Sequence, residues 1–505
     1  MNDQHPSQQQ PGVPWSEPAA GPPPAPEADG GWHRLHPVTP VIRSWKVVAV
    51  LLVVYVQQRS DALFAGQGLP GRTEVLVSVG LLLIGVLVGV AASALSWRMT
   101  RYQVDGEAVH LHSGVLFRQQ RQARLDRLQA VDVVQPLLAR ILGLAELRLE
   151  VAGGAGSDVR LAYLKEAEAQ RLRNTLLARA AGVRYETAEA PEAPEREVLT
   201  VPVDRLLASL LRSGTTVALV LTAAALLVGV VWLDLPGLLA GLGPALLATA
   251  IAVWTRFSHE FSFRVAVSPD GVRLRHGLLE QRAQTVPPGR VQALRLSQPL
   301  LWRRPDWWRV EINVAGYGGG QEEGTANVLL PVGPREDAVA VLSLVLPDLG
   351  VQDPVAALDD GLSGTTAERG WVVAPSRSRW VDWVSWRRNG YLVAGTALLL
   401  RRGRLWRQLD VVPHERTQSL GLNQGPLQRR LRLATMAAHP TPGPVQPTVS
   451  HLDAEVALGL LTEQAERARR ARRGAGPERW MADAAPPADP GAPADRGTGP
   501  PQPPG

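Results

Sequence analysis

The chain has 505 residues, 53 Lys and Arg against 47 Asp and Glu, and no cysteine. The missing cysteine excludes disulfides, cysteine-ligated zinc or iron–sulfur sites and a cysteine nucleophile, and the length predicts three or four structural units of about 100–200 residues each. The mean hydropathy is close to zero. It nevertheless averages polar, Pro-rich ends with strongly apolar blocks, and those blocks predict a membrane protein.

The N-terminal part predicts a disordered segment and then a first transmembrane hairpin over 41–97. Residues 1–31 are Pro-rich and lack the basic-then-apolar pattern of a signal peptide, so we expect no cleaved leader. Val75–Trp97 carries no charge over 23 residues, and about 20 suffice to cross a bilayer. The preceding segment, 41–58, is less apolar because it includes Lys46, whose long stem can reach the interface. A buried or interfacial helix is the alternative for that segment.

A second transmembrane hairpin is predicted over 213–255. Ser213–Leu233 and Leu235–Thr255 carry no charge, and Asp234 with the turn residues after it separates them. Arginine and lysine flank the outer ends of both hairpins, whereas the two connections carry little net positive charge. Because such residues favour the cytoplasmic side, we expect a multi-pass protein of a bacterial inner (plasma) membrane, with both termini and all sizeable soluble parts in the cytoplasm.

Three further blocks of the chain, starting at Ser113, His276 and Arg402, align with one another without a gap. In each, a glycine stands thirteen residues before an arginine, which in turn stands two before a glutamine. The aligned positions are Gly114, Arg127 and Gln129; Gly277, Arg290 and Gln292; and Gly403, Arg416 and Gln418. Such a recurring block predicts three copies of one fold.

Each copy is expected to combine several strands with one helix. Alternating apolar residues predict a β-hairpin before the aligned glycine and further strands after it, and a helical pattern closes each block, at Leu164–Ala180, Arg335–Leu346 and Leu452–Arg473. We therefore predict an α+β multi-pass membrane protein with three barrel- or sheet-like modules, each with a C-terminal helix that can plug the open end of its sheet. The expected modules span 98–182, 256–348 and 386–473, with linkers at 183–204 and 349–385 and a disordered Pro-rich tail at 474–505.

This combination resembles the bacterial pleckstrin-homology-like (PH-like) membrane proteins, the YdbS/YdbT-like family. The resemblance rests on Leu35-His36-Pro37, on the aligned glycine and Arg-x-Gln pair, on Gln135-Pro136-Leu137-Leu138 and on Leu-Gly-Leu at 142–144. It covers about residues 33–473, and the first block is the closest. It implies a PH-like fold, a membrane-associated role, and cell-envelope stress or resistance to membrane-active agents as a theme. It also implies a companion membrane protein of the same family as a partner.

The sequence offers no catalytic anchor, since it holds no HExxH, no GxSxG and no convincing pair of catalytic carboxylates. We therefore expect a protein that is not an enzyme and that has no cofactor or metal. His110 and His112 share one face of a strand, but no third ligand is near them in the sequence. The glycine-rich segments 153–156 and 316–320 lack phosphate-binding patterns and are expected to be hairpin turns.

The three Arg-x-Gln pairs are the candidate binding residues. As alternate residues of a strand they would share one face, where they could clamp a backbone turn and hold the module together. The other hypothesis is recognition of a phosphate, carboxylate or peptide, since the guanidinium offers a planar set of donors. The sequence leaves both roles open.

A basic patch of five arginines ends the last predicted helix: Arg467, Arg469, Arg470, Arg472 and Arg473. Near an anionic leaflet each cation can contribute roughly 1 kcal/mol, so the patch is a candidate contact with membrane lipid. A solvated helix end is the alternative. No nucleic acid is expected, because no aromatic residues alternate with these arginines.

These patterns predict a non-enzymatic scaffold or binding platform on the cytoplasmic face of the membrane. Its candidate partners are membrane lipid and a companion PH-like membrane protein or a peptide. Tandem modules would raise the effective concentration of weak contacts. The alternative is a transporter or channel subunit whose four spans form the functional part. It is less favoured because the spans carry almost no ionisable residues, which transport sites usually need.

Overall fold

The computed structural model describes residues 31–34, 36–39, 72–105, 108–114, 119–125, 128–151, 159–180, 195–235, 237–268, 271–315 and 327–474. Several predictions therefore concern residues outside these ranges. They are the disordered ends apart from Gly31 and Gly474, the first span at 41–58, Arg127, and the glycine-rich segments 153–156 and 316–320.

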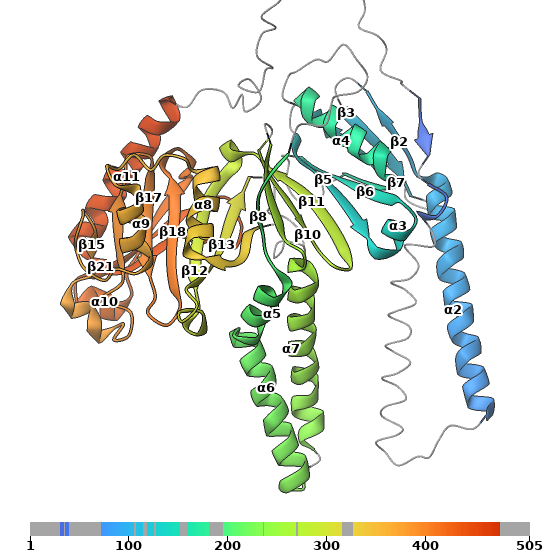
Figure 1. The fold of residues 1–505 in the computed structure, drawn as a ribbon, viewed down its shortest axis with the longest axis horizontal. Helices are drawn as coiled ribbons and strands as arrows, with labels where there is room; N and C mark the ends of the chain where they lie inside the picture. Colours follow the sequence, from blue (N-terminus) through green and yellow to red (C-terminus); the bar gives the residue numbers. More distant parts are fainter. Residues whose placement is uncertain are drawn as a thin grey trace, which may run out of the picture.

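Two of the described helices are long and apolar enough to cross a membrane, judged by length and composition. They are the part of α2 (Arg72–Met99) from Leu76 onward, and Gly214–Trp232, in which α6 (Gly214–Leu227) continues into the π-helical η2 (Val228–Trp232). The Ser213 hydroxyl begins α6 by accepting a hydrogen bond from the amide of Thr216 (3.2 Å). The helix α7 (Leu238–Glu260) packs beside α6 (Figure 1). This second helix pair lies where the sequence predicts a hairpin, and the count of four spans stays a prediction.

Within the described residues, four antiparallel sheets hold the strands. The first contains β1 (His33–Arg34), β2 (Arg101–Val104), β3 (Ala108–Ser113) and β4 (Gln119–Arg124). The second contains β5 (Leu128–Pro136), β6 (Leu144–Val151), β7 (Val159–Lys165), β8 (Arg196–Thr200), β9 (Arg264–Ser268), β10 (Gly271–His276) and β11 (Glu280–Val286). The third contains β12 (Val291–Gln298), β13 (Trp307–Val314), β14 (Val328–Pro334), β15 (Val372–Val373), β16 (Gly390–Val393), β17 (Ala397–Arg402) and β18 (Arg407–Pro413). The fourth contains β19 (Ser419–Asn423), β20 (Leu433–His439) and β21 (Thr448–Asp453).

Consecutive modules share sheets, which the sequence did not predict. Each aligned block divides its strands between two sheets, and the later strands of one block join the earlier strands of the next. The second sheet has the order β7-β6-β5-β11-β10-β9-β8, and the third has the order β14-β13-β12-β18-β17-β16-β15. The pairs β5–β11 and β12–β18 are therefore the joints between modules, and the three modules form one row (Figure 1).

A helix covers each module near the predicted place. These helices are α4 (Glu166–Ala180), α8 (Arg335–Val345) and α11 (Ala454–Gly474), which pack on β5 and β6, on β13 and β14, and on β19 and β20. The helix α4 begins two residues later than predicted, because Leu164 and Lys165 complete β7. Two one-turn helices, α3 (Leu137–Ile141) and α10 (Pro426–Arg430), occupy equivalent places in the first and third modules.

The segments predicted as linkers contain regular elements. The strand β8 lies within 183–204 and pairs with β9 in the second sheet. The segment 349–385 contains α9 (Pro354–Leu362), the 3-10 turn η5 (Ser376–Trp380) and β15, which pairs with β16. The short helix α5 (Val203–Leu211) then leads from β8 into α6. These segments belong to the modules and position the parts that follow them.

The aligned glycines mark one recurring turn. Gly114, Gly277 and Gly403 have φ of 109°, 114° and 75°, a region that residues with a side chain rarely adopt. A Cβ on Gly277 would stand 1.9 Å from the carbonyl oxygen of Glu280. The repeat therefore needs glycine at the turns before β4, β11 and β18.

Candidate functional site

The second and third Arg-x-Gln pairs do not lie on strands as alternate residues. Arg290 and Arg416 each end a 3-10 turn, η3 (Pro288–Arg290) and η6 (His414–Arg416). Gln292 lies in β12, and Gln418 precedes β19. The prediction of a shared strand face is therefore wrong for the second and third pairs, because the chain turns between the two strands at this point. In the first pair Gln129 lies in β5, and Arg127 is outside the described residues.

The contacts of the second pair join two modules. The Arg290 guanidinium donates to the carbonyl of Leu128 (3.1 Å), which belongs to the preceding module. The Gln292 amide donates to the carbonyl of Arg290 itself (3.4 Å). In the third pair the Arg416 guanidinium contacts the neighbouring Glu415 carboxylate (3.0 Å). These bonds to the protein's own backbone and side chains favour the turn-clamping role over ligand recognition.

The basic patch belongs to the C-terminal end of α11. Arg467 pairs with Glu463 (2.6 Å), and Arg472 donates to the carbonyl of Thr417 (2.6 Å). In Figure 1 this end of α11 lies at the top of the third module, whereas α6 and α7 extend from the bottom of the second. That placement favours the solvated helix end over contact with lipid.

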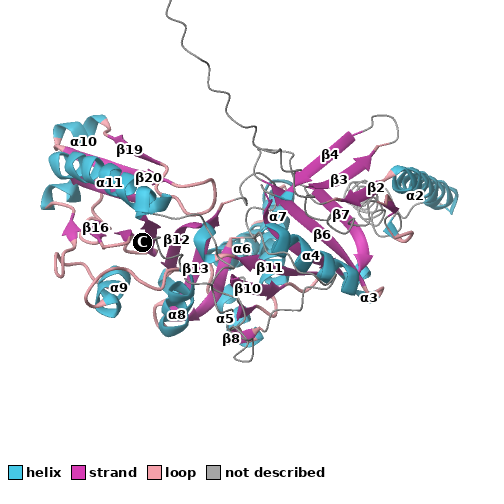
Figure 2. Ribbon diagram, turned by 90° about the horizontal axis from the view of Figure 1, so that it is seen from above, coloured by secondary structure: helices cyan, strands magenta, loops and turns pink. Residues whose placement is uncertain are grey.

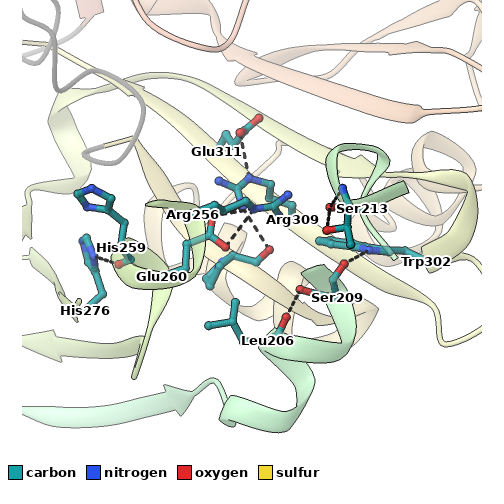
Figure 3. A network of polar contacts seen from close by, with 12 residues as sticks. Leu206, Ser209, Ser213, Arg256, His259, Glu260, His276, Trp302, Arg309 and Glu311 are labelled. Atoms are coloured by element: carbon teal, nitrogen blue, oxygen red, sulfur yellow. Dashed lines mark hydrogen bonds and ion pairs between the residues drawn. The ribbon is translucent and has the colours of Figure 1, made fainter. Parts of the chain in front are cut away.

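A buried network fixes the helix pair to the second module (Figure 3). Glu260, at the end of α7, is 5% exposed and accepts from Arg309 of β13 (2.6 Å) and from Arg256 (3.3 Å). Arg309 also pairs with Glu311 (3.0 Å). These two carboxylates outweigh burial and raise the pKa of Arg309, so its guanidinium stays charged and makes strong charge-assisted hydrogen bonds here.

A second contact ties the helix pair to a turn of the sheet. The Trp302 indole, on the 3-10 turn η4 (Leu300–Trp302), donates to the carbonyl of Ser209 in α5 (3.1 Å). The guanidinium of Arg256 lies 5.9 Å from the centre of the Trp302 ring. The described residues thus place η4 directly against the base of the α6–α7 pair.

A polar cavity of about 530 Å³ opens beside η4, between the second and third modules. Its arginines come from the turn after η4, from the segment before β16, from the β17–β18 connection and from the start of β18. The lining comprises Arg303, Arg387, Arg388, Arg404 and Arg407, with Ser363, Thr365, Trp383, Val384 and Trp386. We call this the arginine cavity.

The arginine cavity concentrates positive charge without matching carboxylates. None of its five arginines makes an ion pair with any residue that the structure describes. Arg388 is 3% exposed, and three backbone carbonyls hold its terminal nitrogens, while its buried Nε has no partner there. Burial, and then the charges of Arg407, Arg401 and Arg303, lower the pKa of Arg388 to about 9. An anion in the cavity would relieve this repulsion, because it would supply the missing counter-charge.

In the third module, the segment that carries the cavity stands in the place of α5, α6 and α7. In the second module, α5, α6 and α7 lie between β8 and β9; in the third, only 374–389 lies between the equivalent β15 and β16. This segment exposes 70% of Trp380 and 82% of Trp383, and the neighbouring β17–β18 connection exposes 59% of Trp406. Exposed indoles beside arginines are typical of surfaces that lie in the headgroup layer of a membrane.

The sequence reasoning missed this site because its residues come from segments far apart in the chain. The signal available was the run Arg377–Arg388, rich in tryptophan and arginine, which stands at the place where the sequence predicts a transmembrane hairpin before each of the first two blocks. The structure also pairs His110 with Asp105 (2.8 Å). The described residues contain no group of three or more His, Asp and Glu side chains placed to hold a metal ion.

Comparisons with known proteins agree with the repeated fold. The family model described as "Bacterial PH domain" matches residues 48–180, 209–348 and 361–470. A curated relative, the UPF0699 transmembrane protein YdbT of Bacillus subtilis (strain 168), is 21% identical over 308 residues, which cover 55% of this chain and 62% of the relative. The match thus spans less than two thirds of that relative's length, and no solved structure matches significantly. With three matched copies that together cover more than half of the chain, this protein belongs to the bacterial PH domain family.

Proposed function

We propose that the chain is a non-enzymatic, membrane-anchored scaffold that holds a rigid row of PH-like modules on the cytoplasmic face, with the third module bound to anionic lipid headgroups through the arginine cavity. The observation that carries the proposal is the arginine cavity itself, with five arginines beside exposed tryptophans. The segment that carries the cavity occupies the place in the third module that α5, α6 and α7 occupy in the second. The ligand chemistry is a phosphate group, which guanidinium donors bind well.

The scaffold part of the proposal rests on the joints. Because the sheets run from one module into the next, a partner bound to one module is held at a fixed distance from partners on the others. The network around Glu260 fixes this row to α7, which packs beside α6 and η2, a helix long and apolar enough to cross a membrane. A channel or transporter is less favoured, because α6 and η2 carry no charged side chain.

Docking of the third module can be followed with one fluorophore, since the chain has no cysteine. The variant Leu405→Cys places an environment-sensitive label on the β17–β18 connection, where Leu405 is 44% exposed. The labelled full-length chain is placed in nanodiscs of phosphatidylglycerol or of phosphatidylcholine. We expect the blue shift of a membrane-inserted label in phosphatidylglycerol and a smaller shift in phosphatidylcholine.

The matched variants remove equal charge from two places. Adding Arg387→Ala with Arg404→Ala removes two cavity cations, worth roughly 2 kcal/mol or about thirtyfold in the docked fraction. Adding Arg469→Ala with Arg470→Ala removes two exposed cations from α11 and should leave docking unchanged. Equal losses in both variants would contradict docking through the cavity. If inorganic phosphate stabilised the chain against thermal unfolding while the label showed no docking, the ligand would be a soluble phosphate instead.

The orientation needs its own test. The variants Asp234→Cys and Arg469→Cys place single thiols in the α6–α7 connection and on α11. A membrane-impermeant maleimide should label Asp234→Cys in intact cells and Arg469→Cys only after lysis. The opposite pattern would contradict the cytoplasmic placement of the modules.

A further inference from the structure

The two joints between modules are built in the same register. In the first, Val133 lies opposite Ala283. In the second, Leu296 lies opposite Leu409. Counted from the aligned Arg127, Arg290 and Arg416, Val133 is equivalent to Leu296 and Ala283 to Leu409. One and the same edge-to-edge contact therefore occurs twice within the chain.

Each joint also contains a buried ion pair. Arg282 of β11 pairs with Asp132 of β5 (2.7 Å), and Arg295 of β12 pairs with Asp410 of β18 (2.6 Å). Asp132 and Arg295 are equivalent positions, so the charge at this place is reversed from one joint to the other. If the internal strands exchanged partners, Asp132 would meet Asp410 and Arg295 would meet Arg282, so the reversal disfavours exchange.

Within the described residues, the same two kinds of edge lie at the ends of the row. The strand β4 is the counterpart of β11 and β18, and β19 is the counterpart of β5 and β12. In the described sheets β4 and β19 are outermost strands, paired only with β3 and with β20. They lie toward opposite ends of the molecule (Figure 2). The helix α4 packs on β5 and leaves the edge of β5 free to pair with β11. The helix α11 packs on β19 in the same way.

We propose that β19 of one chain pairs with β4 of a second copy of this chain, in the register of the internal joints, so that copies associate head to tail at the membrane. The equivalent register sets Leu422 of one copy opposite Gln120 of the next. Main-chain hydrogen bonds would supply most of the affinity, as in other strand additions. The membrane geometry fits, because α2 precedes the first module as α7 precedes the second and both helices extend to the same side (Figure 1).

The open edges differ from the joints in a way that fits reversible contact. Five of the six β4 residues are exposed, and β19 carries no charged residue, so the third contact lacks the buried ion pair of the internal joints. Charged and polar residues on an edge weaken unwanted pairing. Because the two edges belong to different ends, the contact is heterologous and predicts a series of oligomers rather than one closed dimer.

The test uses the full-length chain in phosphatidylglycerol vesicles. One sample of Leu422→Cys is mixed with one of Gln120→Cys and oxidised, and we expect disulfide-linked pairs between the two variants. Leu422→Cys mixed with Arg124→Cys, four residues away on β4 and out of register, should link at least tenfold less. Equal linking of both mixtures, or none, would overturn the proposal.

A charge test keeps the result independent of cysteine chemistry. The variant Leu422→Glu with Gln120→Glu places like charges opposite each other and should dissolve the oligomer series. The variant Leu422→Glu with Gln120→Lys should retain it. Both pairs change exposed side chains, and thermal unfolding checks that each variant folds. A wild-type chain that stays monomeric at all protein densities in the vesicles would exclude self-association, and so would an oligomer series that like charges leave unchanged. If β19 and β4 paired only with a different PH-like protein, a second copy of this chain would be excluded as the partner.

Discussion

The joint between the second and third modules should depend on the ion pair between Arg295 and Asp410. Two guanidinium nitrogens of Arg295 contact the two carboxylate oxygens of Asp410 at 2.6 and 3.0 Å, and Asp410 is 0% exposed. The same guanidinium donates to the carbonyls of Pro444 and Gln446 (3.2 and 3.0 Å). The variant Arg295→Met leaves a buried carboxylate and two carbonyls without their donor.

Removal of one partner of such a buried pair costs about 3–5 kcal/mol. Arg402 lies 3.7 Å from Asp410, too far to replace both lost hydrogen bonds. Hydrogen exchange of the full-length chain measures the effect locally, because it reports the opening free energy of each strand. We expect exchange in β12 and β18 to accelerate by roughly 10²- to 5 × 10³-fold, with little change in β5 and β6.

The double variant Arg295→Met with Asp410→Leu is the control, since it removes the charge as well as its partner. Replacing a buried pair by apolar residues is often neutral, so the double variant should recover most of the protection. A single variant that changes exchange less than about fivefold, roughly 1 kcal/mol, would refute the role assigned to this pair. A double variant as unstable as the single one would show that the carbonyl contacts carry the effect.

Three further results are expected. Gly403→Ala should destabilise the third module by roughly 1–3 kcal/mol in thermal unfolding, because its φ is +75° and a Cβ would lie 2.0 Å from the carbonyl oxygen of Trp406. The control Gly459→Ala on α11, which has open space around it, should be neutral or stabilising. Equal effects of the two variants would contradict the turn assignment. Burial lowers the pKa of His276 to about 4, below its unfolded value near 6.5, so stability should be complete above pH 6.5 and decline by up to about 3 kcal/mol as the pH falls toward 4. The variant His276→Gln should flatten that decline, and an unchanged profile would exclude His276 as its source. Arg290→Ala should cost roughly 1–2 kcal/mol and speed exchange near Leu128 in the preceding module, while a stable variant that had lost a ligand would return this arginine to a binding role.

The repeat and most of its elements could be predicted from local patterns. The aligned Gly277 and Gly403 predict turns, and both residues lie at a positive φ, directly after β10 and β17. The helical spacing of Arg335–Leu346 predicts α8 to within one residue. A turn or a helix can be predicted from the sequence because it depends on residues that are close together in the chain.

The joints between modules could not be predicted in the same way. Alternation predicts that β5 and β11 are strands but does not specify which edges pair, and Val133 and Ala283 meet across 150 residues of sequence. The 3-10 turns at Arg290 and Arg416 also defeated the strand prediction, because the alternate spacing of Arg and Gln is equally compatible with a turn followed by a strand.

The arginine cavity was missed for a related reason. Arg303, Arg388 and Arg404 lie in three segments, and only the shared third sheet brings them together. Arginine is so frequent in this chain that these residues did not stand out in the sequence. What distinguishes them is the lack of carboxylate partners within the described residues, a property of the fold that no spacing could reveal.

Electron cryo-microscopy of the full-length chain in phosphatidylglycerol nanodiscs tests the central claim most directly. The account predicts one continuous row of modules, with Trp383 and the arginine cavity in the headgroup layer and the C-terminal end of α11 directed away from the bilayer. A third module separated from the membrane, or modules that move independently with β12 and β18 unpaired, would contradict it.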